Sequence, residues 1–287
     1  MRGTPKPPWL KIRLRAGPTY HGVLRHLQQG RLHTVCQEAH CPNMGECFSK
    51  GTATFLILGD RCTRNCGFCA VGQGPEGSPD PGEPQRVAEA ALAMGLTYVV
   101  ITSVTRDDLA DGGAGHFAET IREVRKRLPG ARVEVLIPDF RGSTEALETV
   151  LDARPDVLNH NLETVPRLYP RARPGAEYRR SLDLLSTARS LAPWVITKSG
   201  LMLGLGEAGH EVRAVLSDLI SAGCVVLTMG QYLQPSRDHL PVERFLPPEE
   251  FEAWRGIALN VGFREVASGP LVRSSYHAGE LYRSLRR

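Results

Sequence analysis

The sequence TATFLILGDRCTRNCGFC spans residues 52–69 and joins an apolar run to a cysteine-rich loop. The apolar part, Thr52–Gly59, has the length and character of a buried β-strand. The loop after it places Cys62, Cys66 and Cys69 at the spacing C-x3-C-x2-C. Three thiolates this close together can hold one face of an iron–sulfur cubane and leave its fourth iron open to another ligand. The segment therefore predicts a metal centre at the carboxyl end of a strand.

Beyond this loop, apolar runs alternate with helical patterns along the chain. The predicted strands are Thr52–Gly59, Thr97–Val104, Arg132–Pro138, Val157–Glu163, Val195–Gly204 and Val225–Leu233. The predicted helices cover residues 84–95, 115–128, 143–153, 178–191, 209–222 and 248–261. Buried strands that alternate with amphipathic helices favour a parallel sheet covered by helices. Six such units predict an α/β fold, a partial (β/α)6 TIM-type barrel, with active residues at the carboxyl ends of its strands.

The two ends of the chain do not follow this alternation of strands and helices. We expect residues 1–50 to form an N-terminal extension with one helix near Tyr20–Arg31, and residues 51–247 to form the barrel. Residues 248–287 then form a helix and a C-terminal extension. Because the active residues of such a barrel lie at its mouth, both extensions are predicted to cover the mouth.

A second cysteine triplet lies in the N-terminal extension. Cys36, Cys41 and Cys47 have the spacing C-x4-C-x5-C in a loop-like stretch that contains Pro and Gly. A zinc site of three cysteines and one histidine, His33 or His40, is as compatible with this spacing as a second iron–sulfur cluster. For the Cys62 triplet, zinc is less favoured, because zinc sites usually show paired C-x2-C knuckles.

The composition sets broader limits. Seven cysteines are an odd number, and six of them belong to the two triplets, so metal binding is a better explanation than disulfides. The seventh, Cys224, is expected to be a small buried residue. The net charge of +4 is too small to indicate nucleic-acid binding. No run approaches the roughly 20 apolar residues of a membrane helix, and no secretory signal is recognisable. We therefore expect a cytoplasmic protein that binds neither nucleic acid nor membrane.

The C-x3-C-x-aromatic-C motif after the first strand resembles the radical S-adenosylmethionine superfamily. Longer segments resemble its lipoyl synthase family: LHTVCQEAHCPNMGECFSKGTATFLILGDRCTRNCGFCAV, VVITSVTRDDLADGGAGHFAETI, TKSGLMLGLGE and the terminal VASGPLVRSSYHA. The resemblance runs from about Pro7 to Ala278, and the C-x4-C-x5-C triplet and the RSSY tail are specific to this family.

The resemblance implies a sulfurtransferase with two [4Fe–4S] clusters. Cys62, Cys66 and Cys69 would hold the cluster that binds and cleaves S-adenosylmethionine. Cys36, Cys41 and Cys47 would hold an auxiliary cluster, with Ser274 favoured over Ser275 as the ligand of its fourth iron. That cluster would supply two sulfur atoms to C6 and C8 of an octanoyl chain, which starts lipoate formation on a protein.

The resemblance also implies partners. The octanoyl chain would be carried by a lysine of a lipoyl carrier domain, either the E2 component of a 2-oxoacid dehydrogenase or the glycine-cleavage H protein. The electron donor would be a protein such as ferredoxin or flavodoxin, and the enzyme would be a monomer.

Polar residues at predicted strand ends are candidates for binding S-adenosylmethionine, because that is where a barrel of this kind places its ligands. They are Ser103, Asp107, Asn161, Glu163 and Lys198, and they are joined by Phe68 from the cysteine loop.

Overall fold

One eight-stranded sheet organises the chain. The structure is a computed structural model, and it describes residues 6–12, 16–74 and 77–286. The strand order is β1-β2-β5-β6-β7-β8-β9-β10, with β1 antiparallel to β2 and every other pair parallel. The strands are β1 (His33–Thr34), β2 (Thr54–Ile57), β5 (Tyr98–Ser103), β6 (Arg132–Leu136), β7 (Val157–Asn159), β8 (Ile196–Leu203), β9 (Val226–Gln231) and β10 (Glu265–Gly269). A separate pair, β3 (Arg61–Cys62) and β4 (Gly72–Gln73), lies in the cysteine loop.

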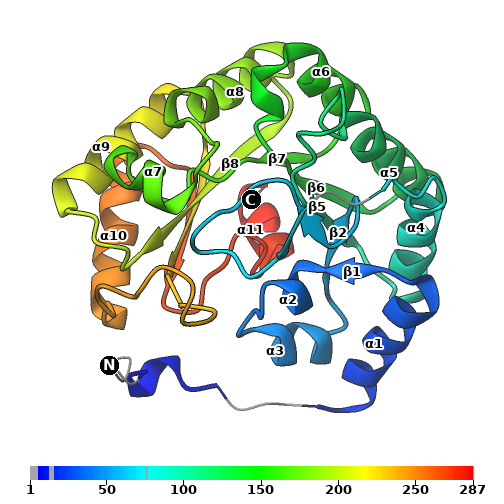
Figure 1. Cartoon of the computed structure of the whole chain (residues 1–287), viewed down its shortest axis with the longest axis horizontal. Coiled ribbons are helices and arrows are strands. Elements are labelled where there is room, and N and C mark those ends of the chain that lie inside the picture. Colours follow the sequence, from blue (N-terminus) through cyan, green and yellow to red (C-terminus); the bar gives the residue numbers. More distant parts are fainter. Residues whose placement is uncertain (1–5, 13–15, 75–76, 287) are drawn as a thin grey trace.

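Most of the helices lie around the outside of the curved sheet (Figure 1). The helices are α1 (Pro18–Gly30), α2 (Val35–Glu38), α3 (Met44–Ser49), α4 (Glu83–Ala93), α5 (Ala114–Arg127), α6 (Thr144–Asp152), α7 (Tyr169–Ala172), α8 (Tyr178–Leu191), α9 (Gly209–Ser221), α10 (Pro248–Val261) and α11 (Ala278–Ser284). Within the described ranges the sheet stays open between β1 and β10, so the fold is a partial barrel.

The predicted barrel is confirmed, with one parallel strand more than expected, and the short antiparallel strand β1 beside it. Each of the six predicted strands contains an observed one, and each of the six predicted helices overlaps an observed one, although α4 and α5 begin one residue earlier than expected. The additional strand, β10, pairs in parallel with β9 from Glu265↔Val226 to Gly269↔Gly230. Its sequence, EVASG, lacks the continuous apolar character that marks the other strands, which is why periodicity missed it.

Side chains alternate between the two faces of each strand, as in any pleated sheet. On β5, Val99 and Ile101 are fully buried in the hydrophobic core. Tyr98, Val100 and Thr102 point the other way and line cavities inside the barrel. The core therefore lies between sheet and helices, and the barrel interior is left for the functional site.

The C-terminal helix α11 closes the amino end of the barrel and not its mouth. A Cβ built on Gly279 of α11 would lie 3.2 Å from the Cβ of Tyr98, at the start of β5. The rings of Tyr98 and Tyr282 lie 5.7 Å apart. The expectation that the whole C-terminal extension covers the mouth is therefore wrong for α11. The reason is that this helix has an apolar side, including Tyr282, that packs beneath the strands.

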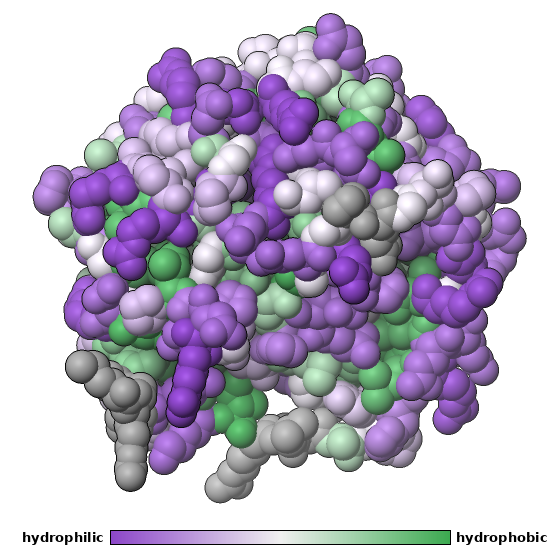
Figure 2. Space-filling view, viewed as in Figure 1, coloured by the Kyte–Doolittle hydropathy of each residue, from purple (hydrophilic) through white to green (hydrophobic). Residues whose placement is uncertain are grey.

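Hydrophilic residues dominate the face of the molecule viewed in Figure 2, and hydrophobic residues show in smaller patches between them. Among the described residues, no helix has the length and apolarity needed to cross a membrane.

Candidate active site

The C-x3-C-x2-C loop opens into a cavity of about 190 Å³ at the carboxyl ends of the strands, which we call the upper cavity. Its lining includes Cys62, Cys66, Cys69, Phe68, Ser103, Asn161 and Glu163. The structure thus brings the predicted cluster cysteines together with four of the six residues proposed to bind S-adenosylmethionine.

The entrance to the cysteine loop has an unusual backbone. Leu58 and Gly59, directly after β2, both have positive φ angles, 69° and 92°. For Leu58 this left-handed conformation is strained. The buried carboxylate of Glu83 holds it, because its Oε2 accepts the Leu58 N–H at 2.8 Å. The turn aims the loop back over the barrel mouth.

Within the loop, Arg64 is held by two carboxylates. Its Nε and Nη2 donate to Asp107 at 2.7 and 3.0 Å, and Nη2 also donates to Asp139 at 2.5 Å. Burial alone would raise the pKa of Asp139, but the hydrogen bond and charge of Arg64 outweigh it and lower that pKa to about 2. Asp107 uses both oxygens on Arg64 and does not line the upper cavity. The expectation that Asp107 contacts S-adenosylmethionine is corrected: it positions the cysteine loop.

Two residues that line the upper cavity each have a polar side-chain atom without a partner. Ser103 Oγ and Asn161 Oδ1 are buried and have no hydrogen-bond partner in the structure. Asn161 Nδ2 donates to Glu163 Oε1 at 2.9 Å. Glu163 has a positive φ of 67°, and burial raises the pKa of its carboxyl. Buried polar atoms normally find partners, and strained residues cluster at functional sites, so this set fits a polar ligand.

Lys198 lies elsewhere. Its Nζ donates to Glu134 Oε1 at 2.7 Å, and the two side chains are only 2% and 1% exposed. Tyr98 donates to the other oxygen of Glu134 at 2.6 Å. These residues surround a small space beneath the barrel that α11 closes. Lys198 is therefore a structural cation at the amino end, and the prediction that it binds S-adenosylmethionine is wrong.

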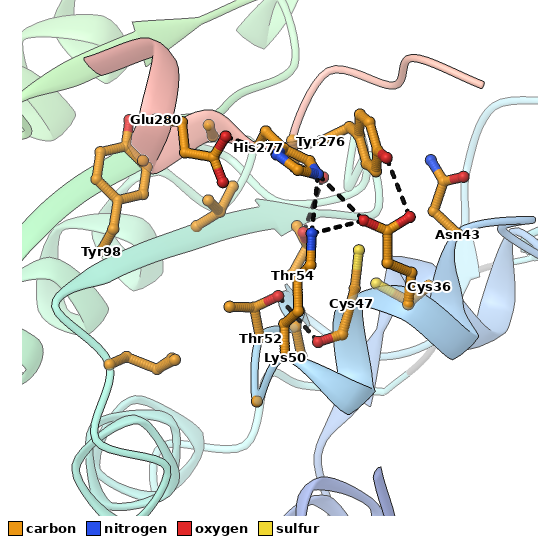
Figure 3. Close-up of a pocket in the computed structure, with 18 of the residues that line it drawn as sticks. Cys36, Asn43, Cys47, Lys50, Thr52, Thr54, Tyr98, Tyr276, His277 and Glu280 are labelled. Atoms are coloured by element: carbon orange, nitrogen blue, oxygen red, sulfur yellow. Dashed lines mark hydrogen bonds and ion pairs between the residues drawn. The ribbon is translucent and has the colours of Figure 1, made fainter. Parts of the chain in front are cut away.

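The other triplet lines a second space, about 300 Å³ in volume, which we call the lower cavity. Cys36 lies on α2, Cys47 on α3 and Cys41 in the turn between them, so this stretch is more helical than the expected loop. Figure 3 shows Cys36 and Cys47 close to Thr54, with Tyr276 of the C-terminal segment across from them.

The two cavities are stacked along the barrel and share no lining residue. On β2, Thr54 lines the lower cavity and Leu56 the upper one. On β5, Val100 lines the lower cavity and Thr102 the upper one. Two residues along a strand advance by roughly 6.6 Å, so the cavities are separated by about one layer of side chains.

The C-terminal segment forms part of this separation. The Ser274 Oγ accepts from Asn161 Nδ2 at 2.8 Å, on the side of the upper cavity. The Ser275 Oγ accepts from Thr54 at 2.8 Å and lines the lower cavity with the three cysteines. The two serines are adjacent in a turn and bond to different partners, and Ser275, unlike Ser274, lines the lower cavity. The structure brings Ser275, and not the predicted Ser274, to the auxiliary cysteines.

Burial makes several thiols of the two triplets resist ionisation when nothing is bound. Burial, with the neighbouring cysteines, raises the pKa of Cys36 to about 12 and that of Cys47 to about 11. Burial likewise raises the pKa of Cys66 to about 11 and that of Cys69 to about 12. Metal binding reverses this, because coordinated thiols are deprotonated outright. Three free thiols that line one cavity therefore fit an iron–sulfur cluster in each of the two cavities.

A single ion fits less well. Across the described ranges, no three His, Cys, Asp or Glu side chains lie close enough together to hold one metal ion. The zinc alternative for either triplet thus gains no support from the geometry.

Comparison with known proteins agrees with this arrangement. Residues 56–219, more than half of the chain, match the family model described as the Radical SAM superfamily. The chain is 59% identical over 278 residues to the lipoyl synthase of Desulfotalea psychrophila, which covers 97% of this chain and 93% of that one. It is also 59% identical over 276 residues to the lipoyl synthase of Methylococcus capsulatus, with coverages of 96% and 86%. The chain belongs to the lipoyl synthase family.

Membership of this family implies S-adenosylmethionine and two [4Fe–4S] clusters. A solved structure of Streptococcus suis SuiB bound to its precursor peptide shares the fold alone, with a TM-score of 0.59 and 11% identity over 79% of this chain and 50% of that one.

Sequence reasoning missed several residues of the lipoyl synthase site. Arg173 and His160 line the upper cavity, and Arg173 donates to the Asn161 carbonyl at 2.9 Å. Arg173 lies in an arginine-rich stretch where no pattern distinguishes it. Arg273 lines the lower cavity. It stands in the RSSY motif, and that position was the available signal.

Proposed function

We propose that the protein is a lipoyl synthase, a sulfurtransferase that inserts sulfur at C6 and C8 of an octanoyl chain carried on a lysine of a lipoyl carrier domain. The observation that carries the proposal is the stacking of two three-cysteine cavities in one barrel interior. A substrate carbon between them can face a radical source on one side and a sulfur source on the other.

The C–H bonds at C6 and C8 are unactivated, so no acid or base of the protein can break them, and a cofactor must supply the reactivity. When bound, S-adenosylmethionine and a reduced [4Fe–4S] cluster supply a carbon radical that abstracts hydrogen. In the upper cavity, Cys62, Cys66 and Cys69 hold the cluster, and Phe68 lies beside them. Ser103, Asn161 and Glu163, which line the same cavity, would bind S-adenosylmethionine through their polar side chains.

In the lower cavity, Cys36, Cys41 and Cys47 hold the auxiliary cluster that donates sulfur. We assign its oxygen ligand to Ser275, because that hydroxyl lines the same cavity as the three thiols while Ser274 is engaged with Asn161. A serine oxygen is a poorer iron ligand than a thiolate, which suits a cluster that is dismantled during turnover.

The proposal also covers the partners of the enzyme and its localisation in the cell. The carrier is the lipoyl domain of a 2-oxoacid dehydrogenase or the glycine-cleavage H protein, and the excess of positive charge, +4, favours an acidic one. Ferredoxin or flavodoxin supplies electrons, and the enzyme works as a cytoplasmic monomer.

The test is a single anaerobic reaction of the purified protein with an octanoylated carrier domain, S-adenosylmethionine and a reductant. The carrier should gain two sulfur atoms and lose two hydrogens by mass, and 5′-deoxyadenosine should form. The protein itself should be brown and hold about eight irons. Formation of 5′-deoxyadenosine with no sulfur on the carrier would point to another radical sulfur inserter. Colourless protein with stoichiometric zinc would point to a zinc-stabilised binding module.

A further inference from the structure

Arg273 is a half-buried cation that the proposed chemistry does not use. Its side chain lines the lower cavity with the auxiliary cysteines. Its Nη1 donates to the Val272 carbonyl at 2.7 Å, which is the hydrogen bond that the structure gives the guanidinium. A guanidinium carries five N–H donors, so most of its donor capacity remains for a group in the cavity.

The backbone of β9 holds this arginine in place. Gly230 lies on β9, and a Cβ built there would be 2.0 Å from the Val272 carbonyl oxygen and 3.1 Å from Arg273 Nη1. Only glycine allows the C-terminal segment to approach the strand this closely. The guanidinium is therefore positioned by packing, and not by a carboxylate partner.

We infer that Arg273 sets the reduction potential of the auxiliary cluster, by placing a positive charge in the cavity formed by Cys36, Cys41, Cys47 and Ser275. The inference rests on the proposed function, because it assumes a cluster in the lower cavity. Adding one electron makes a cluster more negative, so a nearby cation favours the reduced form and raises the potential. A smaller effect in the same direction is expected at the upper cluster, because the upper cavity lies about one layer of side chains further from the arginine.

The guanidinium is only partly exposed and lines a cavity, so water and salt screen it less than a surface charge. At an effective dielectric constant of about 20, a unit charge within about 10 Å changes the reduced-to-oxidised ratio at a fixed potential by at least roughly tenfold. No bond forms or breaks in this step; one electron passes from an external reductant to the cluster.

The experiment uses protein with Cys62→Ala, Cys66→Ala and Cys69→Ala, so that only the auxiliary cluster is present. Its midpoint potential is measured by mediated titration with dithionite, followed by electron paramagnetic resonance. Arg273→Gln removes the charge and Arg273→Lys retains it. Arg283→Gln is the matched control, because Arg283 lines the same cavity from an exposed position on α11.

Arg273→Gln should lower the potential by at least the shift that corresponds to tenfold, about 59 mV for one electron. Arg273→Lys should recover most of it, and Arg283→Gln should change it little. An unchanged potential in Arg273→Gln, with the cluster intact, overturns the inference. Failure of the parent protein to hold any cluster would instead contradict the proposed function.

If Arg273→Gln prevents loading of the auxiliary cluster, the potential of the upper cluster provides the test. In protein with Cys36→Ala, Cys41→Ala and Cys47→Ala, the same substitution should lower the potential of the upper cluster by a smaller amount. An unchanged potential there would then overturn the inference.

Discussion

The two cysteine cavities are built in opposite ways. The upper triplet lies on one loop after β2, and the buried Arg64 ion pairs with Asp107 and Asp139 clamp it. The lower triplet depends on contacts between the two ends of the chain. Thr54 meets Ser275 across 221 positions, and Tyr276 donates to Glu46 across 230.

The difference indicates which of the two sites is held together more firmly. Buried charge networks are costly to break, whereas exposed pairs contribute little. At the rim of the lower cavity, Lys50 and Glu46 pair at 2.7 Å but are 54% and 39% exposed. The upper site is thus a permanent part of the barrel, and the lower site is closed by weaker contacts, as suits a cluster that is consumed and replaced.

The largest effects should come from removing one cysteine of each triplet. Cys62→Ala should abolish cleavage of S-adenosylmethionine, because the upper cluster loses a ligand. Cys41→Ala should retain cleavage and abolish sulfur insertion, because the upper cavity shares no residue with the lower one. The measurements are 5′-deoxyadenosine by chromatography and carrier mass. If either variant kept both activities, the assigned division of labour would be wrong.

A large effect on stability is expected beneath the lower cavity. Lys198→Met would leave the buried carboxylate of Glu134 without its cation. Breaking a buried pair in this way costs about 3–5 kcal/mol of unfolding free energy. Urea unfolding of the anaerobic protein measures it.

Binding of S-adenosylmethionine by the folded Lys198→Met variant should stay close to that of the wild type. As a control, Lys126→Met removes an exposed lysine on α5 and should leave the unfolding free energy nearly unchanged. A loss of S-adenosylmethionine affinity without a loss of stability would restore the original prediction for Lys198.

The two serines of the RSSY segment test the boundary between the cavities. Ser275→Ala should lower sulfur insertion by at least about tenfold while cleavage of S-adenosylmethionine continues, because the lower cavity loses an oxygen ligand. Ser274→Ala should lower sulfur insertion only a few-fold, since it removes a neutral hydrogen bond, which contributes about 1 kcal/mol. Mössbauer spectra of the auxiliary cluster should change in Ser275→Ala and not in Ser274→Ala. A spectral change in Ser274→Ala and none in Ser275→Ala would show that Ser274 is the ligand.

The barrel was predictable because its strands and helices carry strong local periods. The upper cysteines were equally accessible, since their spacing and their place after the first strand are both properties of a short segment. The lower site was not. Two of its cysteines lie on helices too short to show a period, and the third lies between those helices. Ser275 is selected by the direction in which a side chain of the C-terminal turn points.

Lys198 is a second example of a residue whose role could not be predicted from the sequence. The sequence pattern of a strand does not indicate whether an inward-facing lysine lies at the mouth or at the amino end of the barrel. The partner that decides, Glu134, lies 64 positions away on β6. Tertiary pairing of this kind cannot be read from spacing.

The smallest effect concerns the wall of the upper cavity. His160 is buried and bonded to the Ile137 carbonyl at 2.8 Å and to Ser181 Oγ at 2.9 Å. Burial, with the charge of Arg173, lowers its pKa from 6.5 to about 4. The folded state therefore binds fewer protons than the unfolded state below about pH 6.5, so stability falls as the pH falls toward 4.

Between about pH 7.5 and 5.5 this protonation difference should cost roughly 1 kcal/mol of unfolding free energy. His160→Gln should lower stability at both pH values and remove this part of the pH dependence, while His210→Gln, at an exposed position on α9, should retain it. Urea unfolding at the two pH values gives the difference directly. If His160→Gln kept the full acid dependence, the sensitivity would have to come from other titratable groups, and the role assigned to His160 would be wrong.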